Sequence, residues 1–185
     1  MSSSRVWLFR GLVAIAAGLM LASFIMPWWT ADIFSSTLEI NMKDAIRIYG
    51  HGLQHDLIEL REYIIQDETP FYQIILSWIY LAASVGLVLF SPWLNGKKAQ
   101  WLLGSIGIIY ITYVLIAVFI IITGRLGELG FILEGYNYWP GTPGASAGIR
   151  SSLRFGYYLA YTAGGMCIAL ALLRGIIVGK PKNVA

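Results

Sequence analysis

Two histidines and a glutamate at regular spacing are the residues of this chain best suited to chemistry. His51, His55 and Glu59 follow one another at intervals of four residues. On a helix this spacing places two imidazoles on one face, where they can chelate one metal ion. Because His51 and Glu59 would lie about 12 Å apart along the helix axis, only one of them could share an ion with His55. The pattern predicts a His51–His55 metal pair, or His55 with Glu59, completed by ligands from elsewhere.

An ordinary solvated helix face explains the same three residues and is the interpretation we favour. We therefore expect no organic cofactor and treat a bound metal ion as the alternative.

The element that would position these residues is an amphipathic helix from about Met42 to Gln66. Its apolar residues recur with a mean period of about 3.7, which matches an α-helix. They are Met42, Ile46, Tyr49, Leu53, Leu57, Leu60 and Ile64. Gly50 and Gly52 predict a kink, since each costs about 1 kcal/mol relative to alanine inside a helix.

A second set of candidates consists of apolar and aromatic residues suited to contact with a protein partner. Three isoleucines would interrupt the polar face of the predicted helix, and three aromatic residues lie in the glycine-rich segment 124–152. The set is Ile48, Ile58, Ile65, Tyr136, Tyr138 and Trp139. The alternative is that the second loop folds over the isoleucines.

A polar stripe runs along one of the apolar segments. Gln73, Ser77, Tyr80 and Ser84 are spaced by four, three and four residues and so share one helix face. Such a face could line a groove for a lipid, quinone or substrate. Hydrogen bonds between neighbouring helices are the simpler explanation.

The composition is that of an integral membrane protein. Of the 185 residues, 57% are hydrophobic and 12% are charged, whereas soluble domains carry about 25% charged residues. Four segments are long enough to cross about 30 Å of hydrocarbon: 12–29, 72–93, 101–123 and 155–178. The expected fold class is therefore an all-α bundle of four transmembrane helices forming a single membrane domain over residues 1–185.

Charge sorting predicts the orientation. All 10 acidic residues fall between Asp32 and Glu68 or between Glu128 and Glu134. Seven basic residues without acidic neighbours lie in the remaining segments: Arg5, Arg10, Lys97, Lys98, Arg174, Lys180 and Lys182. By the positive-inside rule, both termini face the cytoplasm. The loops 30–71 and 124–154 then face outward, as in a multi-pass protein of the plasma membrane.

Small residues recur at helical spacing in the first and fourth spans, where they favour close helix packing. They are Gly11, Ala14, Gly18 and Ala22 in the first span and Gly156, Ala160 and Gly164 in the fourth. Packing within the chain and packing against a second protein both fit. Neither histidine lies in a span, which disfavours a haem held inside the bundle.

The plan of four spans with both ends inside and a larger first outer loop resembles that of claudin-like proteins. The resemblance is one of topology, because the cysteine pair of that family's first loop is absent here: Cys167 is the only cysteine.

Three functions fit these features. The first is a non-catalytic subunit of a larger membrane assembly, which contacts other membrane proteins or a second copy through its outer helix and aromatic loop. The second is an oligomeric channel or carrier that uses the polar stripe of the second span. The third is a metal-binding or electron-transfer accessory subunit that uses the outer-loop histidines. Nucleic-acid binding is not expected, because the basic residues follow the membrane topology.

Overall fold

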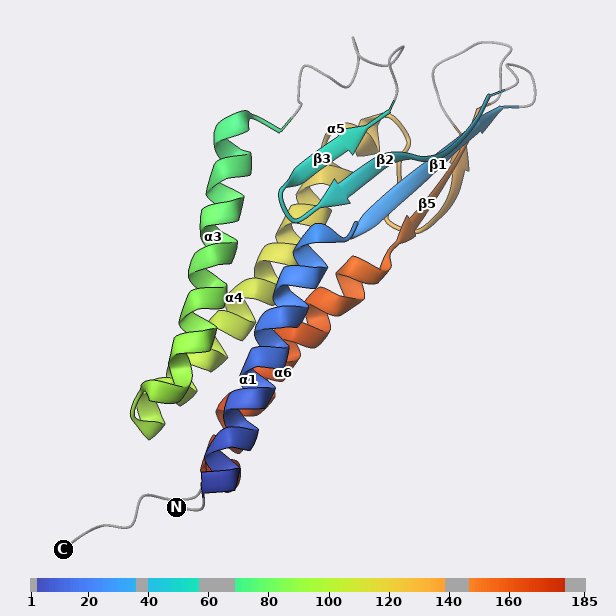
Figure 1. The fold of residues 1–185 in the computed structure, drawn as a ribbon. Coiled ribbons are helices and arrows are strands. Elements are labelled where there is room, and N and C mark those ends of the chain that lie inside the picture. The colour runs from blue at the N-terminus through green and yellow to red at the C-terminus, as the bar shows by residue number, and fades with distance from the viewer. Residues whose placement is uncertain (1–2, 36–39, 57–68, 139–146, 179–185) are drawn as a thin grey trace, which may run out of the picture.

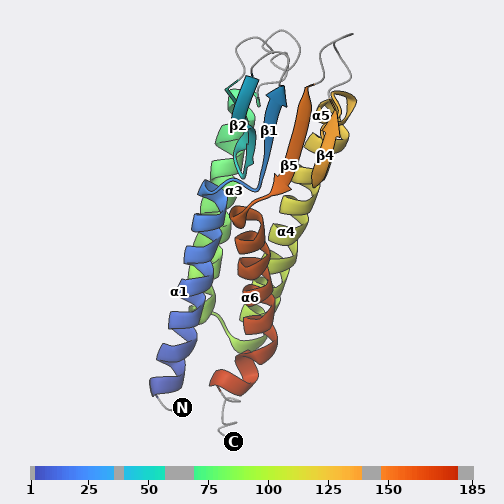
Figure 2. The same cartoon turned by 90° about the vertical axis from the view of Figure 1, so that its right-hand side faces the viewer.

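The protein consists of a helical bundle with a β-sheet at one end (Figure 1). The computed structural model describes residues 3–35, 40–56, 69–138 and 147–178. Four helices are long and apolar enough to cross a membrane: α1 (Ser3–Ile25), α3 (Phe71–Phe90), α4 (Gly96–Thr123) and α6 (Phe155–Val178). Two short helices, η2 (Ser91–Trp93) and α5 (Arg125–Glu128), follow α3 and α4. Helix α1 begins and helix α6 ends at the end of the bundle opposite the sheet (Figure 2).

The helix α6 is the centre of the bundle, and α1 and α4 both pack along it. A Cβ added at Gly107 of α4 would lie 2.6 Å from the carbonyl oxygen of Gly164 on α6. The small residues of α6 thus serve packing within the chain. Those of α1 do not, because Gly11, Ala14 and Gly18 are exposed and nothing lies within 4 Å of a Cβ added at either glycine. Helix α3 packs mainly on α1 and only weakly on α4.

Strands from the two longer loops, which were expected to face outward, form one antiparallel sheet in the order β3-β2-β1-β5-β4. The strands are β1 (Trp29–Ser35), β2 (Ile40–Tyr49), β3 (Gly52–His55), β4 (Gly135–Tyr138) and β5 (Gly148–Leu153). The central strand β1 pairs with β2 from its own loop and with β5 from the other loop. The expectation of an all-α protein is therefore wrong for the loops, although the spans are helical as predicted.

The helix predicted over 42–66 is not formed in its described part. Residues 40–49 and 52–55 are strands joined by a two-residue turn at Gly50 and His51, and residues 57–66 lie outside the described ranges. The periodicity misled because Met42 and Ile46 fit both a helical and an alternating pattern. Of the glycines that predicted a kink, Gly50 lies in the turn of the hairpin and Gly52 begins β3 directly after it. Gly52 has a φ of +140°, which disfavours a side chain.

One face of the sheet packs on the end of the bundle and on the segment that follows α5, where Trp29 meets Phe131. Trp29, Ala31 and Ile33 alternate along β1, and all three are buried. The indole of Trp29 donates to the carbonyl of Leu133, and that of Trp28 donates to the carbonyl of Ser23. Both tryptophans are fully buried, so they join the sheet to the bundle.

A bulge in β2 is held by a polar network that reaches the start of α6. Asp44 has a φ of +49°, a conformation that aspartate tolerates better than most residues. Its N–H donates to Asp32, 2.7 Å away. Its carboxylate accepts from Arg154 at 2.6 Å, and Arg154 also donates to Thr30. This network fixes the central strands to the helix that follows β5.

Candidate functional site

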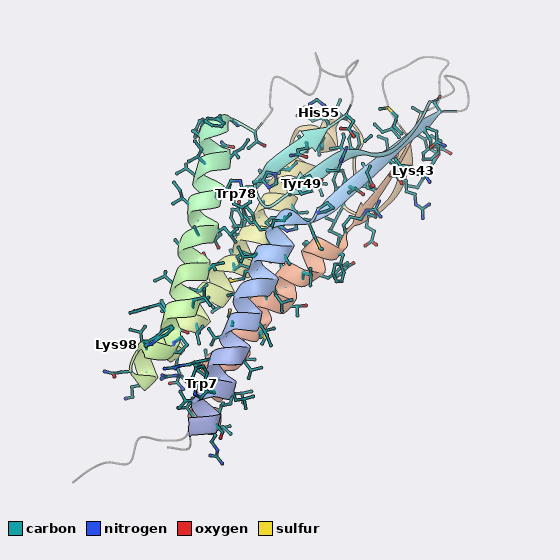
Figure 3. All side chains as sticks on the ribbon, in the orientation of Figure 1. Trp7, Lys43, Tyr49, His55, Trp78 and Lys98 are labelled. Atoms are coloured by element: carbon teal, nitrogen blue, oxygen red, sulfur yellow. The ribbon has the colours of Figure 1, made fainter. Side chains whose placement is uncertain are left out.

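The turn between β2 and β3 rests on an aromatic cluster at the ends of α1 and α3 that lie nearest the sheet. His51 stacks on Tyr49 and on Trp78, with ring centroids 5.2 and 5.7 Å apart. Phe24 contacts the rings of both His51 and Trp78. Figure 3 shows Tyr49 and Trp78 close together where the hairpin meets α3. Burial lowers the pKa of His51, and the backbone carbonyl of Phe24 raises it in part, with a net lowering. His51 is therefore neutral at neutral pH.

A cavity of about 510 Å³ lies below this turn, between α3 and α4. We call it the hairpin cavity. The turn and the outer end of α3 supply its polar lining, including His51, Thr69, Gln73 and Ser77. The opposite wall, from α4 and α5, is mainly apolar and includes Ile120 and Leu126. Its volume falls within the range of about 300–1,000 Å³ that is usual for small-molecule sites.

Tyr113 of α4 closes the cavity on the side of the bundle. Its hydroxyl donates to the carbonyl of Gly50 at 2.7 Å and lies 3.2 Å from the hydroxyl of Ser77. Ser77 in turn donates to the carbonyl of Gln73. Tyr113 thus joins α4 to the hairpin and to the polar stripe of α3.

The polar stripe of the second span is divided between two environments. Gln73 and Ser77 line the hairpin cavity. Farther along α3, Tyr80 packs its ring on Tyr113 at 4.8 Å, and Ser84 is buried in the bundle. Only the outer half of the stripe therefore faces a space large enough for a ligand.

The two histidines predicted to share a metal ion are separated by the strand geometry. His51 lies in the turn and His55 at the end of β3, where Figure 3 shows His55 at the outer side of the sheet. Four residues of extended chain span about 13 Å, much farther than one turn of a helix. Among the described residues no group of three potential ligands could hold a metal ion, and Glu59 lies outside those residues.

The other face of the sheet carries an exposed aromatic cluster. Phe34 on β1 and Tyr136 on β4 lie 5.3 Å apart, and Tyr138 meets Tyr136 edge to face at 5.1 Å. The rings approach over Gly148, where an added Cβ would lie 2.5 Å from both Phe34 and the Tyr136 hydroxyl. Tyr136 and Tyr138 are 48% and 62% exposed. We call these three residues the aromatic face.

Charged residues of both signs border the aromatic face. An open depression of about 750 Å³ is lined by Phe34 and Tyr136 together with Asp32, Lys43, Glu134 and Arg150. Lys43 lies at the outer part of the sheet in Figure 3. Among the described residues, this border has two acidic and two basic side chains, whose charges cancel.

The predicted partner contacts divide into three groups. Tyr136 and Tyr138 are exposed and lie together, as the aromatic face. Ile48, expected on an exposed face, is completely buried in β2. Ile58, Ile65 and Trp139 lie outside the described residues.

Sequence reasoning missed Phe34, Gly148 and Tyr113. Phe34 and Gly148 are neighbours only because β1 pairs with β5, and no local pattern marks that pairing. Comparison with protein-family models and with curated proteins finds no match to this chain.

Proposed function

We propose that this protein is a non-catalytic subunit of a membrane assembly and that it contacts a partner protein through the aromatic face. The cluster of half-buried Phe34 with exposed Tyr136 and Tyr138 is the observation that carries the proposal. In the proposed orientation it faces outward from a plasma membrane and both termini are cytoplasmic, in accord with the positive-inside rule.

The chemistry of the aromatic face favours a protein over a lipid headgroup or a nucleic acid. Tyrosine and arginine are enriched at protein interfaces because they combine large contact area with hydrogen bonding. Asp32 and Glu134 beside Lys43 and Arg150 would attract neither a purely anionic surface nor a purely cationic one. The proposed partner is the outer domain of another membrane protein with charges of both signs.

The open stripe of α1 provides a second contact within the membrane. Gly11, Ala14 and Gly18 leave the backbone of α1 accessible along one side. Small residues at this spacing allow a second helix to approach closely in lipid, where packing replaces the hydrophobic effect. The corresponding residues of α6 already do this within the chain, so α1 is the helix proposed to receive a partner span.

The proposal is tested by affinity purification from native membranes in mild detergent, followed by mass spectrometry. We expect one or more membrane proteins in stoichiometric amount with the wild-type chain. The double variant Tyr136→Ser/Tyr138→Ser should lose the partner, since each interface tyrosine contributes about 1–2 kcal/mol. Tyr158→Ser is the matched control, because Tyr158 is similarly exposed, at 53%, but lies on α6.

The proposal fails if the wild-type chain purifies as a monomer without a partner. It also fails if the double variant and the Tyr158→Ser control retain the same partner equally.

A further inference from the structure

The hairpin cavity is amphipathic, and its described lining has no charged residue. One wall offers polar groups of the hairpin and the first turns of α3, and the other offers aliphatic side chains of α4 and α5. A phosphate would need a lysine or arginine, and an ammonium group would need a carboxylate. Such a lining matches a molecule with an apolar body and an uncharged head.

Several polar groups of the lining retain hydrogen-bonding capacity. The Nδ1 atom of His51 is buried and has no hydrogen-bond partner among the described residues. The hydroxyl of Thr69 accepts from the N–H of Leu53 and keeps its own hydrogen to donate. The side-chain amide of Gln73 has, within the described chain, only a 3.4 Å contact with Tyr72. Together these groups could bind hydroxyl or carbonyl oxygens of a ligand head.

The position of the cavity along α4 suits a lipid whose head lies near the membrane surface and whose apolar body lies in the hydrocarbon. The lining extends along α4 from Gly124, at its outer end, down to Tyr113. Eleven residues of helix correspond to about 16 Å, or roughly half of the hydrocarbon thickness. Because α3 and α4 make few contacts with each other, a molecule could enter between them from the outer leaflet.

We propose that the hairpin cavity is a binding site for an uncharged amphipathic lipid, with the ligand's hydroxyl or carbonyl head at His51, Thr69 and Gln73 and its apolar body against α4. Two sources share this chemistry: a bilayer lipid such as diacylglycerol and an isoprenoid quinone. The proposal does not depend on the partner assigned to the aromatic face.

The test uses the full-length protein in nanodiscs and two photoreactive lipid probes with identical acyl chains. One probe is a diacylglycerol and the other is a phosphatidylglycerol, so that the head is an uncharged hydroxyl in the first and an anionic phosphoglycerol group in the second. We expect the diacylglycerol probe to label peptides from α3 and α4 that line the cavity, at several times the yield of the charged probe. Competition by unlabelled diacylglycerol or by a short-chain ubiquinone then identifies the source of the natural ligand.

Two variants with matched controls decide whether labelling occurs in the cavity. Ala117→Trp places a large ring in the cavity and should abolish labelling, whereas Ile116→Trp, at the neighbouring lipid-exposed position, should not. Gln73→Leu removes one head contact and should lower the apparent affinity about fivefold, the equivalent of one hydrogen bond. Gln100→Leu, at the other end of the bundle, is its control.

Equal labelling by the two probes would show that only acyl chains are recognised and would overturn the proposal. So would labelling that persists in Ala117→Trp. If Ala117→Trp fails to fold, the result for Gln73→Leu decides the test. An unchanged affinity of Gln73→Leu for the diacylglycerol probe would overturn the assignment of the head site.

Discussion

At the scale of single residues, the protein uses polar side chains mainly to join elements that are distant in the sequence. Tyr110 on α4 shares a 2.6 Å hydrogen bond with Ser23 on α1. Arg174 on α6 donates to the carbonyl of Leu94, in the turn after α3, and its guanidinium lies 5.5 Å from the ring of Phe9. Such bonds are favourable because a buried polar group without a partner costs about 1–3 kcal/mol.

Asp44 gives a test of the network that holds the sheet on α6. Partial burial raises the pKa of Asp44, but the hydrogen bond from Thr30 and the guanidinium groups of Arg154 and Arg47 lower it more, and the net pKa lies below the usual 3.8. A lowered carboxylate pKa stabilises the folded state above the unfolded-state pKa. This stability is lost as the pH falls below 3.8 and through the folded-state pKa.

We therefore expect Asp44→Asn to destabilise the protein equally at pH 7 and pH 5, and by less below pH 3.8. The effect should stay below about 1 kcal/mol, because the pair with Arg154 is half exposed. Thermal unfolding followed by tryptophan fluorescence at the three pH values measures it. Asp44→Ala should lower the free energy of unfolding more than Asp44→Asn does, because asparagine tolerates a positive φ better than alanine. A larger loss of stability in Asp44→Asn would contradict the role assigned to the bulge.

Tyr113→Phe tests the single hydroxyl that connects α4 to the hairpin. The substitution removes the donor to the carbonyl of Gly50 and should destabilise the protein by about 1 kcal/mol. It should also increase amide hydrogen exchange in β2 and β3, which Tyr158→Phe, at an exposed position, should not do. Unchanged exchange in the hairpin would show that the aromatic cluster alone holds it.

At the scale of elements, the bundle depends on the contact between α4 and α6. The backbones approach so closely at Gly107 and Gly164 that a Cβ on either residue would lie within 3 Å of the other's carbonyl oxygen. We expect Gly164→Ala to lower the melting temperature in detergent, because the helices must move apart. The adjacent Gly165 has nothing within 4 Å of an added Cβ, so Gly165→Ala is the matched control and should have little effect.

Equal effects of the two alanines would mean that helix propensity, and not packing, determines the result. The same comparison bears on α1, where Gly18→Ala should leave the isolated protein unchanged and affect only its association with a partner.

The hairpin shows why the first outer loop could not be assigned from its sequence. Ile46 and Ile48 lie on the buried face of β2, and the register with β1 shifts at the bulge between Met42 and Ile46. The spacing of four residues between Met42 and Ile46 fits an α-helix as well as an alternating strand, so the sequence pattern could be taken for a helix. The turn signal of Gly50 and Gly52 was present, but a helix with a kink explained it equally well.

At the scale of the whole molecule, the orientation in the membrane can be tested with single cysteines. Cys167 is the only cysteine of the chain and is buried, so cysteines introduced elsewhere can be labelled selectively. With intact cells and an impermeant maleimide, we expect Glu134→Cys and Asn41→Cys to react and Lys98→Cys to react only after permeabilisation. Figure 3 shows Lys98 and Trp7 at the end of the bundle away from the sheet.

Reaction of Lys98→Cys in intact cells, with protection of the other two, would reverse the orientation. The aromatic face would then have to meet a cytoplasmic partner.

The sequence by itself indicated the four helices that are long and apolar enough to cross a membrane, because the hydrocarbon thickness sets the length of a spanning helix. It also predicted both termini on one side, because an even number of crossings returns the chain to its starting side. It also indicated Tyr136, Tyr138, Gln73 and Ser77 as residues worth testing. Only the tertiary structure decided that the two outer loops share a sheet, since Trp29 pairs with Leu153 across most of the chain. It also decided that His51 and Gln73 line the same cavity, and that Gly156, Ala160 and Gly164 of α6 are covered whereas Gly11, Ala14 and Gly18 of α1 are exposed. These features depend on contacts between distant segments, and the free energy of such contacts is not recorded in any local pattern of residues.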